Sequence, residues 1–209
     1  MQGMLLRDGT LVTTYCDRLA ELRETYETYK GSLEGTLFYE WTKLCTRPEP
    51  AALHNIQAVL HQLDRTNNWA LLPLYMTCAA ELTGHSGDAG TAVILLQRAS
   101  EIADFTGSRW CDAEIMRLKA RFLARDAEEA TGLLGASLAI AKEQRAKLWE
   151  LRASITLAEL LSGQGNYPAA CELLKPIYEA FIKGGSSSDS ETAQSFLYEN
   201  KRTQFGMLD

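Results

Sequence analysis

The stretch that decides the fold is LAELLSGQGNYPAACELL, residues 157–174. Its two halves carry apolar residues three and four apart, which is typical of amphipathic helices. Between them lies the turn Gly-Gln-Gly-Asn-Tyr-Pro. Glycine ends a helix readily, and proline suits the first turn of the next helix, where its missing N–H costs nothing. Similar stretches occur at 79–96 (AAELTGHSGDAGTAVILL) and 119–134 (KARFLARDAEEATGLL).

Small residues show that this unit repeats. Four alanines expected at close helix crossings follow one another at intervals of 40, 38 and 40 residues: Ala52, Ala92, Ala130 and Ala170. A tryptophan opens each of the last three units: Trp69, Trp110 and Trp149. The middle unit has a shorter loop without glycine, in which Asp126 is the expected N-cap. Markers that share a period of about 39 residues predict stacked helix pairs.

The pattern predicts an all-α protein, because no sustained alternation of apolar and polar residues indicates a strand. The expected helices span 10–30, 33–45, 50–66, 69–83, 89–106, 110–125, 127–144, 148–162, 168–183 and 189–202. The expected parts of one continuous domain are a divergent N-terminal region (1–68), three repeats (69–109, 110–147 and 148–183), and a linker with a capping helix (184–209). Ser188 and Glu191 have the spacing of a capping box that begins the last helix.

The order of residues in each unit resembles the tetratricopeptide repeat. A small residue (Ala158) is followed by Gly165, Tyr167, Ala170 and an apolar residue, Ile177. The family has a usual period of 34 residues, and its usual proline after the second helix is missing here. The resemblance implies a right-handed α-α superhelix of helix pairs, with longer helices and a period of about 39.

Residues 69–200 resemble more closely the C-terminal helical-repeat region of large bacterial signalling proteins, which also contain an ATPase and a nucleotide-cyclase or DNA-binding module. The matching features are Gly-Ser-Arg-Trp at 107–110, Lys-Leu-Trp-Glu-Leu-Arg-Ala at 147–153 and Leu-Leu-Lys-Pro-Ile-Tyr at 173–178. The resemblance implies a regulatory array of a signalling ATPase, adenylate cyclase or related transcriptional activator. No Gly-x-x-x-x-Gly-Lys-Ser/Thr phosphate loop occurs in the sequence. The start LLRDGT (5–10) looks like the end of a repeat helix and favours a fragment of a longer protein.

Composition argues against several classes of function and location. The formal net charge of −6 disfavours non-specific binding to nucleic acid or to an anionic membrane. No apolar run reaches the ~18 residues of a membrane-spanning helix, and the N-terminus lacks the pattern of a secretory signal. The five cysteines are far apart in the sequence, which favours free thiols in a reducing cytoplasm.

The sequence predicts no catalytic, cofactor or metal site. GHSGD (84–88) lacks the final glycine of a nucleophile elbow and falls in the turn between two helices. His54 and His61 lie seven residues apart rather than four, and His85 is the remaining histidine. These scattered histidines do not assemble a nucleophile, base and orienting group, so we expect no enzyme.

The first helix of each pair usually lines the concave face of such an array. Counting from the small residue of each unit gives the candidate partner-binding residues: Thr77, Glu81, Glu114, Arg117, Arg121, Arg125, Arg152, Ile155 and Glu159. Arg117, Arg121 and Arg125 form a helical row suited to an acidic peptide or a phosphate. The alternative is a solvated face in which Glu114 pairs with Arg117.

The predicted function is therefore a non-catalytic protein-interaction and regulatory module. Its expected partner is a protein, a peptide or a neighbouring domain of its parent protein, bound on the concave face. The alternative is a sensor of a small-molecule effector. That function requires an enclosed pocket, for which the aromatic-rich N-terminal region is the candidate: Tyr26, Tyr29, Phe38, Tyr39 and Trp41.

Overall fold

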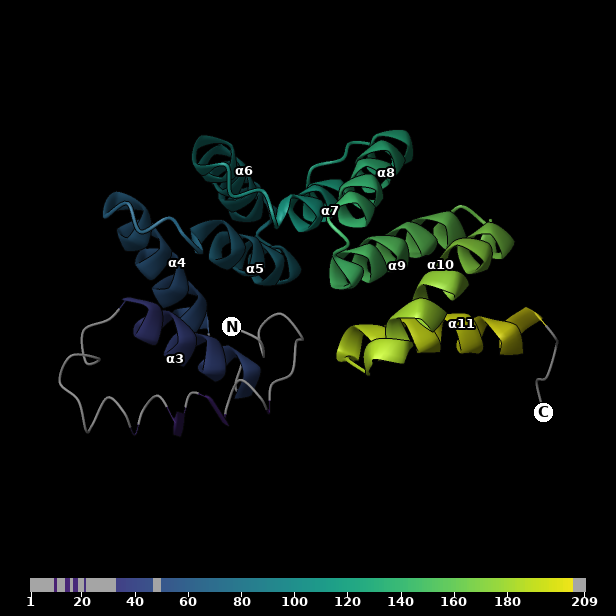
Figure 1. Ribbon diagram of the computed structural model, residues 1–209, viewed down its shortest axis with the longest axis horizontal. Coiled ribbons are helices and arrows are strands. Elements are labelled where there is room, and N and C mark those ends of the chain that lie inside the picture. Colours follow the sequence, from purple (N-terminus) through teal and green to yellow (C-terminus); the bar gives the residue numbers. More distant parts are fainter. Residues whose placement is uncertain are drawn as a thin grey trace. The chain divides into compact units, whose positions relative to one another are not determined.

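The computed structural model describes residues 10, 14–15, 17–18, 21, 33–46 and 50–204. In these ranges all regular secondary structure is helical, which confirms the all-α prediction (Figure 1). Most of the expected helix at 10–30 lies outside the described residues. The chain divides into two compact units, Met1–Arg109 and Trp110–Asp209.

The first unit contains four described helices. They are α3 (Leu33–Thr46), α4 (Pro50–Arg65), α5 (Leu72–His85) and α6 (Ala89–Thr106). Each packs against the next along the chain. The expected helix at 69–83 begins later as α5, because Trp69 belongs to the preceding turn and Pro73 lies in the first turn of the helix.

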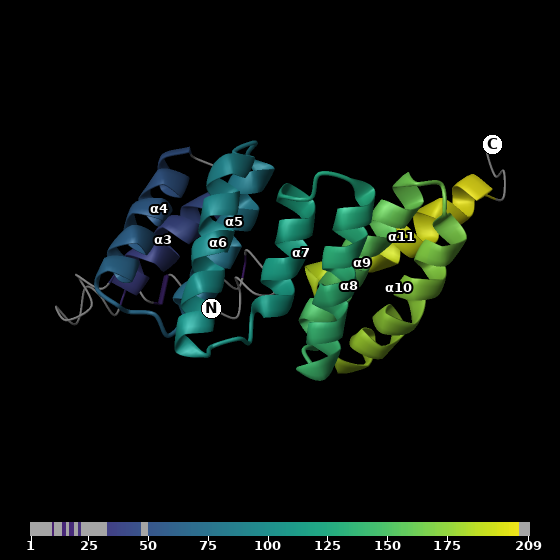
Figure 2. The ribbon, with the colours of Figure 1, turned by 90° about the horizontal axis from the view of Figure 1, so that it is seen from above.

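The second unit contains two helix pairs and a final helix. They are α7 (Asp112–Phe122), α8 (Ala127–Glu143), α9 (Lys147–Gly163), α10 (Tyr167–Phe181) and, after a short 3₁₀ turn η2 (Ile182–Gly184), α11 (Ser188–Gln204). Consecutive helices pack together, and α9 also contacts both α7 and α11 (Figure 2). In this unit the first helices of the two pairs, α7 and α9, therefore contact each other.

Short-range polar contacts explain where these helices begin. The Asp126 carboxylate accepts a hydrogen bond from the Glu129 N–H at 2.8 Å, which confirms Asp126 as the N-cap of α8. In the turn that decides the fold, Gly165 has a φ of 81°, a conformation that L side chains adopt at a cost. Asn166 then caps α10 by accepting from the Ala169 N–H.

The capping box of α11 lies one residue earlier than expected. The Ser187 N–H donates to Ser190 Oγ at 2.8 Å, and the Ser190 N–H donates to Ser187 Oγ at 3.3 Å. The prediction of Ser188 and Glu191 was therefore wrong by one position. The tertiary contacts explain the shift, because this register buries Asp189 and Ala193 against the rest of the second unit and leaves Glu191 in solvent.

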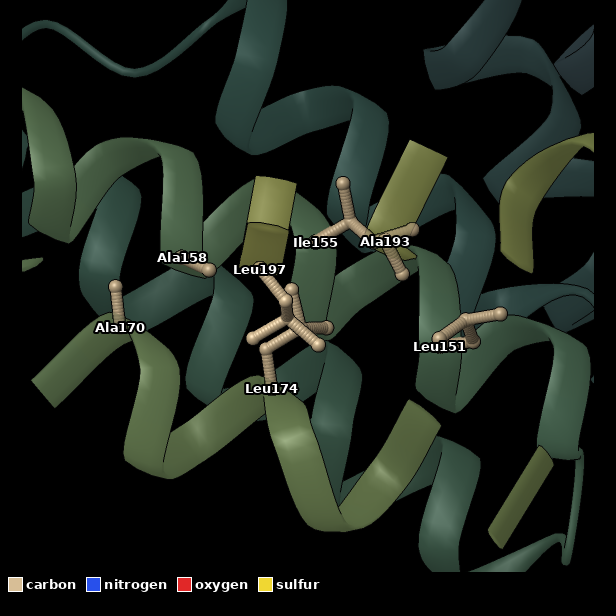
Figure 3. Packing of buried hydrophobic residues seen from close by; sticks show 7 residues of the cluster. All are labelled: Leu151, Ile155, Ala158, Ala170, Leu174, Ala193 and Leu197. Atoms are coloured by element: carbon tan, nitrogen blue, oxygen red, sulfur yellow. The ribbon is translucent and has the colours of Figure 1, made fainter. Parts of the chain in front are cut away.

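Alanines and leucines form the contacts between helices. The four period-marking alanines, at positions 52, 92, 130 and 170, are all buried. The core of the second unit combines residues of α9, α10 and α11: Leu151, Ile155, Ala158, Ala170, Leu174, Ala193 and Leu197 (Figure 3). The three tryptophans that open the repeats are not equivalent, because Trp149 is buried while Trp110 is 36% exposed.

Candidate functional site

The predicted partner-binding residues divide into a buried set and an exposed set. Arg121, Arg125 and Glu159 are exposed, and Glu81 is half-buried. The others are buried: Thr77, Glu114, Arg117, Arg152 and Ile155. The expectation of a continuous accessible row is therefore wrong for the buried set. Helical periodicity placed these residues on a common face but did not reveal that this face is covered.

Four buried charges form a continuous chain of ion pairs, which we call the buried charge chain. Arg117 on α7 donates from Nε and Nη2 to the two oxygens of Glu114, both at 2.8 Å. Arg152 on α9 donates from Nη1 to Glu114 Oε1 at 3.1 Å. The same guanidinium donates from Nε to Asp189 Oδ2 on α11 at 2.9 Å. The chain thus connects α7, α9 and α11.

Three residues of the buried charge chain are spaced by about one sequence repeat. Glu114 and Arg152 are 38 residues apart, and Arg152 and Asp189 are 37 apart. The residues of this chain of ion pairs are two arginines and two carboxylates. Buried ions need both a partner and further hydrogen bonds to offset lost hydration. Arg117 Nη1 donates to the Thr156 hydroxyl at 3.3 Å, and the Arg152 guanidinium lies 5.3 Å from the Trp149 ring centroid.

The pairing of Glu114 with Arg117 was predicted for a solvated face, and the pairing itself is confirmed. Its environment differs, because both side chains are only 3% exposed. Their hydrogen-bonding groups face each other inside the protein. Of the predicted arginine row, Arg121 and Arg125 are the residues exposed to solvent.

The exposed members form weak pairs at the surface. Arg121 Nη1 lies 3.9 Å from Glu159 Oε2, which joins α7 to α9 in parallel with the buried charge chain. Arg125 pairs elsewhere, and its Nε donates to Glu129 at 3.1 Å. The backbone N–H of Arg125 also donates to Glu129, and these contacts lower the pKa of the Glu129 carboxyl. Exposed pairs of this kind contribute little stability, so their charges remain available to a partner.

The first unit contains an ion pair that the sequence analysis did not identify. Asp64 accepts from Arg98 Nε at 2.7 Å and Nη2 at 2.8 Å, and from the Trp69 indole N–H at 3.0 Å. The hydrogen bond from Arg98 is the largest cause of a lowered pKa of Asp64. Asp64 and Arg98 are 34 residues apart, which does not match the period of about 39, so the repeat pattern gave no signal for this pair.

The candidate aromatic pocket is only partly within the described residues, since Tyr26 and Tyr29 lie outside them. Phe38 packs edge-on against Tyr75 with ring centroids 5.8 Å apart, and Trp41 is buried. Tyr39 is exposed, with Lys43 Nζ 4.6 Å from its ring centroid.

Glu40 is the one described residue with a buried side-chain oxygen that lacks a hydrogen-bond partner. Its Oε1 accepts from Lys43 Nζ at 3.0 Å, whereas its Oε2 is the unpaired atom. An unpaired buried acceptor is unfavourable, because it has lost its hydrogen bonds to water without replacement. This atom would gain from a donor supplied by a ligand.

The described residues contain no group of three or more His, Cys, Asp or Glu side chains placed to hold a metal ion. In the same part of the chain, no helix has both the length and the apolar character needed to cross a membrane.

The GHSGD segment is a turn, as predicted, because α5 ends at His85 and Asp88 caps α6. Cys78, Cys111 and Cys171 are not part of a disulfide bond.

Comparison with known proteins assigns the chain to no family. No protein-family model, curated protein or solved structure matches the sequence or the fold. The function must therefore be argued from the residues and their contacts.

Proposed function

We propose that the protein is a non-catalytic protein-interaction module. In this proposal its helix pairs form a right-handed, tetratricopeptide-like superhelix with a period of about 39 residues, and α11 caps it. The module belongs to the C-terminal part of a cytoplasmic bacterial signalling protein and binds a protein, a peptide or a neighbouring domain. The observation that carries this proposal is the packing of α9 against both α7 and α11. Stacking of first helices generates a long surface of the kind that repeat proteins use for binding.

The exposed charges of α7 and α9 are the partner-binding residues in this proposal. Arg121 and Glu159 lie on neighbouring first helices and hold each other only at 3.9 Å. Such a pair exchanges readily for contacts to a partner, because a solvent-exposed pair is worth only ~0–1 kcal/mol. A partner segment that carries both signs of charge complements this surface, because Arg121 and Glu159 are of opposite charge.

The test is affinity capture with the full chain from an extract of the cells that express it, quantified by mass spectrometry. The charge swap Arg121→Glu with Glu159→Arg keeps a pair at the same place but reverses its polarity. The matched control swaps Lys175 and Glu179, an exposed pair on α10 at the same 3.9 Å separation. We expect the first swap to remove a specifically captured protein and the control swap to retain it. Equal capture by both variants would contradict the proposed surface.

The second candidate, an effector sensor, has one specific observation in its favour, the unpaired Oε2 of Glu40. A ligand with an amine or hydroxyl donor would satisfy that oxygen, and the adjacent exposed Tyr39 offers aromatic surface. Thermal denaturation of the full chain with a panel of amines and polyols tests this candidate. A stabilising compound whose effect disappears in Glu40→Gln supports it, and a flat response across the panel argues against it.

A further inference from the structure

Within the second unit, helix α11 packs on the preceding helices through one face of its first three turns, as far as its side chains are described. The buried residues on this face are Asp189, Ala193 and Leu197, spaced four residues apart. Residues four apart lie on the same side of a helix. The intervening side chains of Glu191, Gln194 and Ser195 are exposed, so the helix presents a polar outer face.

The surface that receives α11 is built by α9 and α10. Its apolar part includes Leu151 and Ile155 of α9 and Leu174 of α10, which pack with Ala193 and Leu197 (Figure 3). Its polar part is Arg152, which directs Nε and Nη2 at one oxygen of Asp189, each at 2.9 Å. We call these four residues of α9 and α10 the docking face.

Arg152 is held in place independently of α11. Its Nη1 donates to Glu114 on α7, and Glu114 is in turn fixed by two hydrogen bonds from Arg117. Nε and Nη2 of Arg152, which contact Asp189, therefore keep their orientation when α11 is displaced. A fixed arginine fork beside an apolar surface is suited to a carboxylate on an amphipathic helix.

The connection to α11 permits its release. The segment before α11 is Gly184, Gly185, Ser186 and Ser187, a composition typical of flexible linkers. Gly185 has a φ of 132°, which disfavours any other residue. Among the described side chains of α11, the apolar anchors are the buried Ala193 and Leu197 and the partly buried Phe196, whose ring centroid lies 5.7 Å from that of Tyr167.

We propose that the docking face is a binding site for an amphipathic partner helix, and that α11 is its intramolecular occupant. The contacts of α11 define the partner: a carboxylate, then a small residue four positions later and a leucine-like residue eight positions later. This inference rests on the proposed interaction function and names the site and the chemistry of the partner. Because α11 is tethered, it competes at high effective concentration, and a partner binds only by displacing it.

The test uses the full chain and a fluorescently labelled peptide of residues 185–204 as the probe. Leu197→Asp in the full chain removes an apolar anchor of the tethered helix and leaves the docking face unchanged. Tyr198→Asp is the matched control, because it introduces the same charge at the neighbouring exposed position. Fluorescence anisotropy should show that the peptide binds the Leu197→Asp chain more tightly than the unsubstituted chain, by on the order of tenfold or more. The reason is that the weakened α11 no longer competes strongly for the docking face. The Tyr198→Asp chain should behave like the unsubstituted chain.

Two further variants test the recognition of the carboxylate. The Asp189→Asn peptide and the Arg152→Gln change in the Leu197→Asp chain should each weaken binding by at least on the order of tenfold. Equal binding of the unsubstituted and the Asp189→Asn peptides would overturn the inferred recognition of a carboxylate. Absence of peptide binding to a folded Leu197→Asp chain would overturn the docking face as a binding site. If Leu197→Asp fails to give a cooperative melt, Leu197→Ala replaces it and the same outcomes apply.

The capture experiment separates this inference from the proposed function. Loss of a captured protein on the Arg121 and Glu159 swap, without any peptide binding, leaves the interaction function standing and removes the docking face. If the peptide binds in the expected pattern and both charge-swap variants capture the same proteins as the unsubstituted chain, the docking face is supported and the proposed concave binding surface is contradicted.

Discussion

Replacing Trp149 with alanine should destabilise the second unit strongly. The Trp149 side chain lies at the beginning of α9 and is only 5% exposed. Its indole N–H donates to the Trp110 carbonyl at 3.3 Å, and the Arg152 guanidinium lies over its ring. The substitution therefore removes apolar burial, a hydrogen bond and a contact to the buried charge chain together.

The size of the effect follows from the buried area. A tryptophan buries ~150–250 Å², which at ~25 cal/mol per Å² corresponds to ~4–6 kcal/mol. The unfolded chain already buries part of this surface, which lowers the value by ~10–40%. The expected loss in the free energy of unfolding is therefore ~3–5 kcal/mol, in the range measured when buried aromatic residues are replaced by alanine.

The assay is urea denaturation followed by far-UV circular dichroism, which does not depend on the tryptophan that is removed. If the chain unfolds in two transitions, the loss belongs to the transition of Trp110–Asp209, the unit that contains Trp149. Ile94→Ala is the control, because Ile94 is 69% exposed and its loss should change stability by less than ~0.5 kcal/mol. A loss below ~1 kcal/mol for Trp149→Ala would refute the assigned burial.

Three further perturbations follow from the same contacts. Arg152→Met should cost ~3–5 kcal/mol in urea denaturation because it removes the guanidinium that bridges the buried carboxylates of Glu114 and Asp189, and added Asp189→Asn should restore part of the loss. Asp64→Asn should be less stable than the unsubstituted chain at neutral pH. Arg98 lowers the folded pKa of Asp64 below its ordinary 3.8, so this difference should be fully present above that value and vanish as the pH falls through the folded pKa. Truncation after Gly184 should lower the melting temperature and increase light scattering, because it uncovers the docking face; equal melting and a monodisperse product would contradict this role of α11.

Local signals in the sequence were sufficient to locate the helices. The expected helix at 89–106 coincides with α6 (Ala89–Thr106), where Asp88 is the N-cap and Gly107 follows in the left-handed conformation. The expected helix at 110–125 shortens to α7 (Asp112–Phe122). Residues 123–126 form the turn between α7 and α8, and Asp126 at its end is the N-cap of α8. Capping chemistry thus overrides helical propensity at the end of α7.

The candidate site was predicted less well than the helices. Periodicity placed Glu114, Arg117 and Arg152 on one face, but burial depends on which helix covers that face. The cover comes from contacts of α9 with α7 and α11, between residues 37 or 38 positions apart in sequence. A usable signal was nevertheless present. Glu114, Arg152 and Asp189 alternate in charge and are spaced by about one sequence repeat. This alternation indicates ion pairing where the helices that carry them pack together.

The buried charge chain also determines where α11 docks. Alanine and leucine contacts recur in every unit, so apolar packing alone discriminates poorly between one first helix and another. The charges alternate instead, with Glu114 on α7, Arg152 on α9 and Asp189 on α11. A helix that carries Asp189 is attracted to α9, whereas the corresponding position on α7 would oppose it with the like charge of Glu114. Like charges brought together without water are strongly unfavourable, so this alternation selects one docking position among similar surfaces. The same rule applies to the proposed partner helix, whose carboxylate fits Arg152 and is repelled by Glu114.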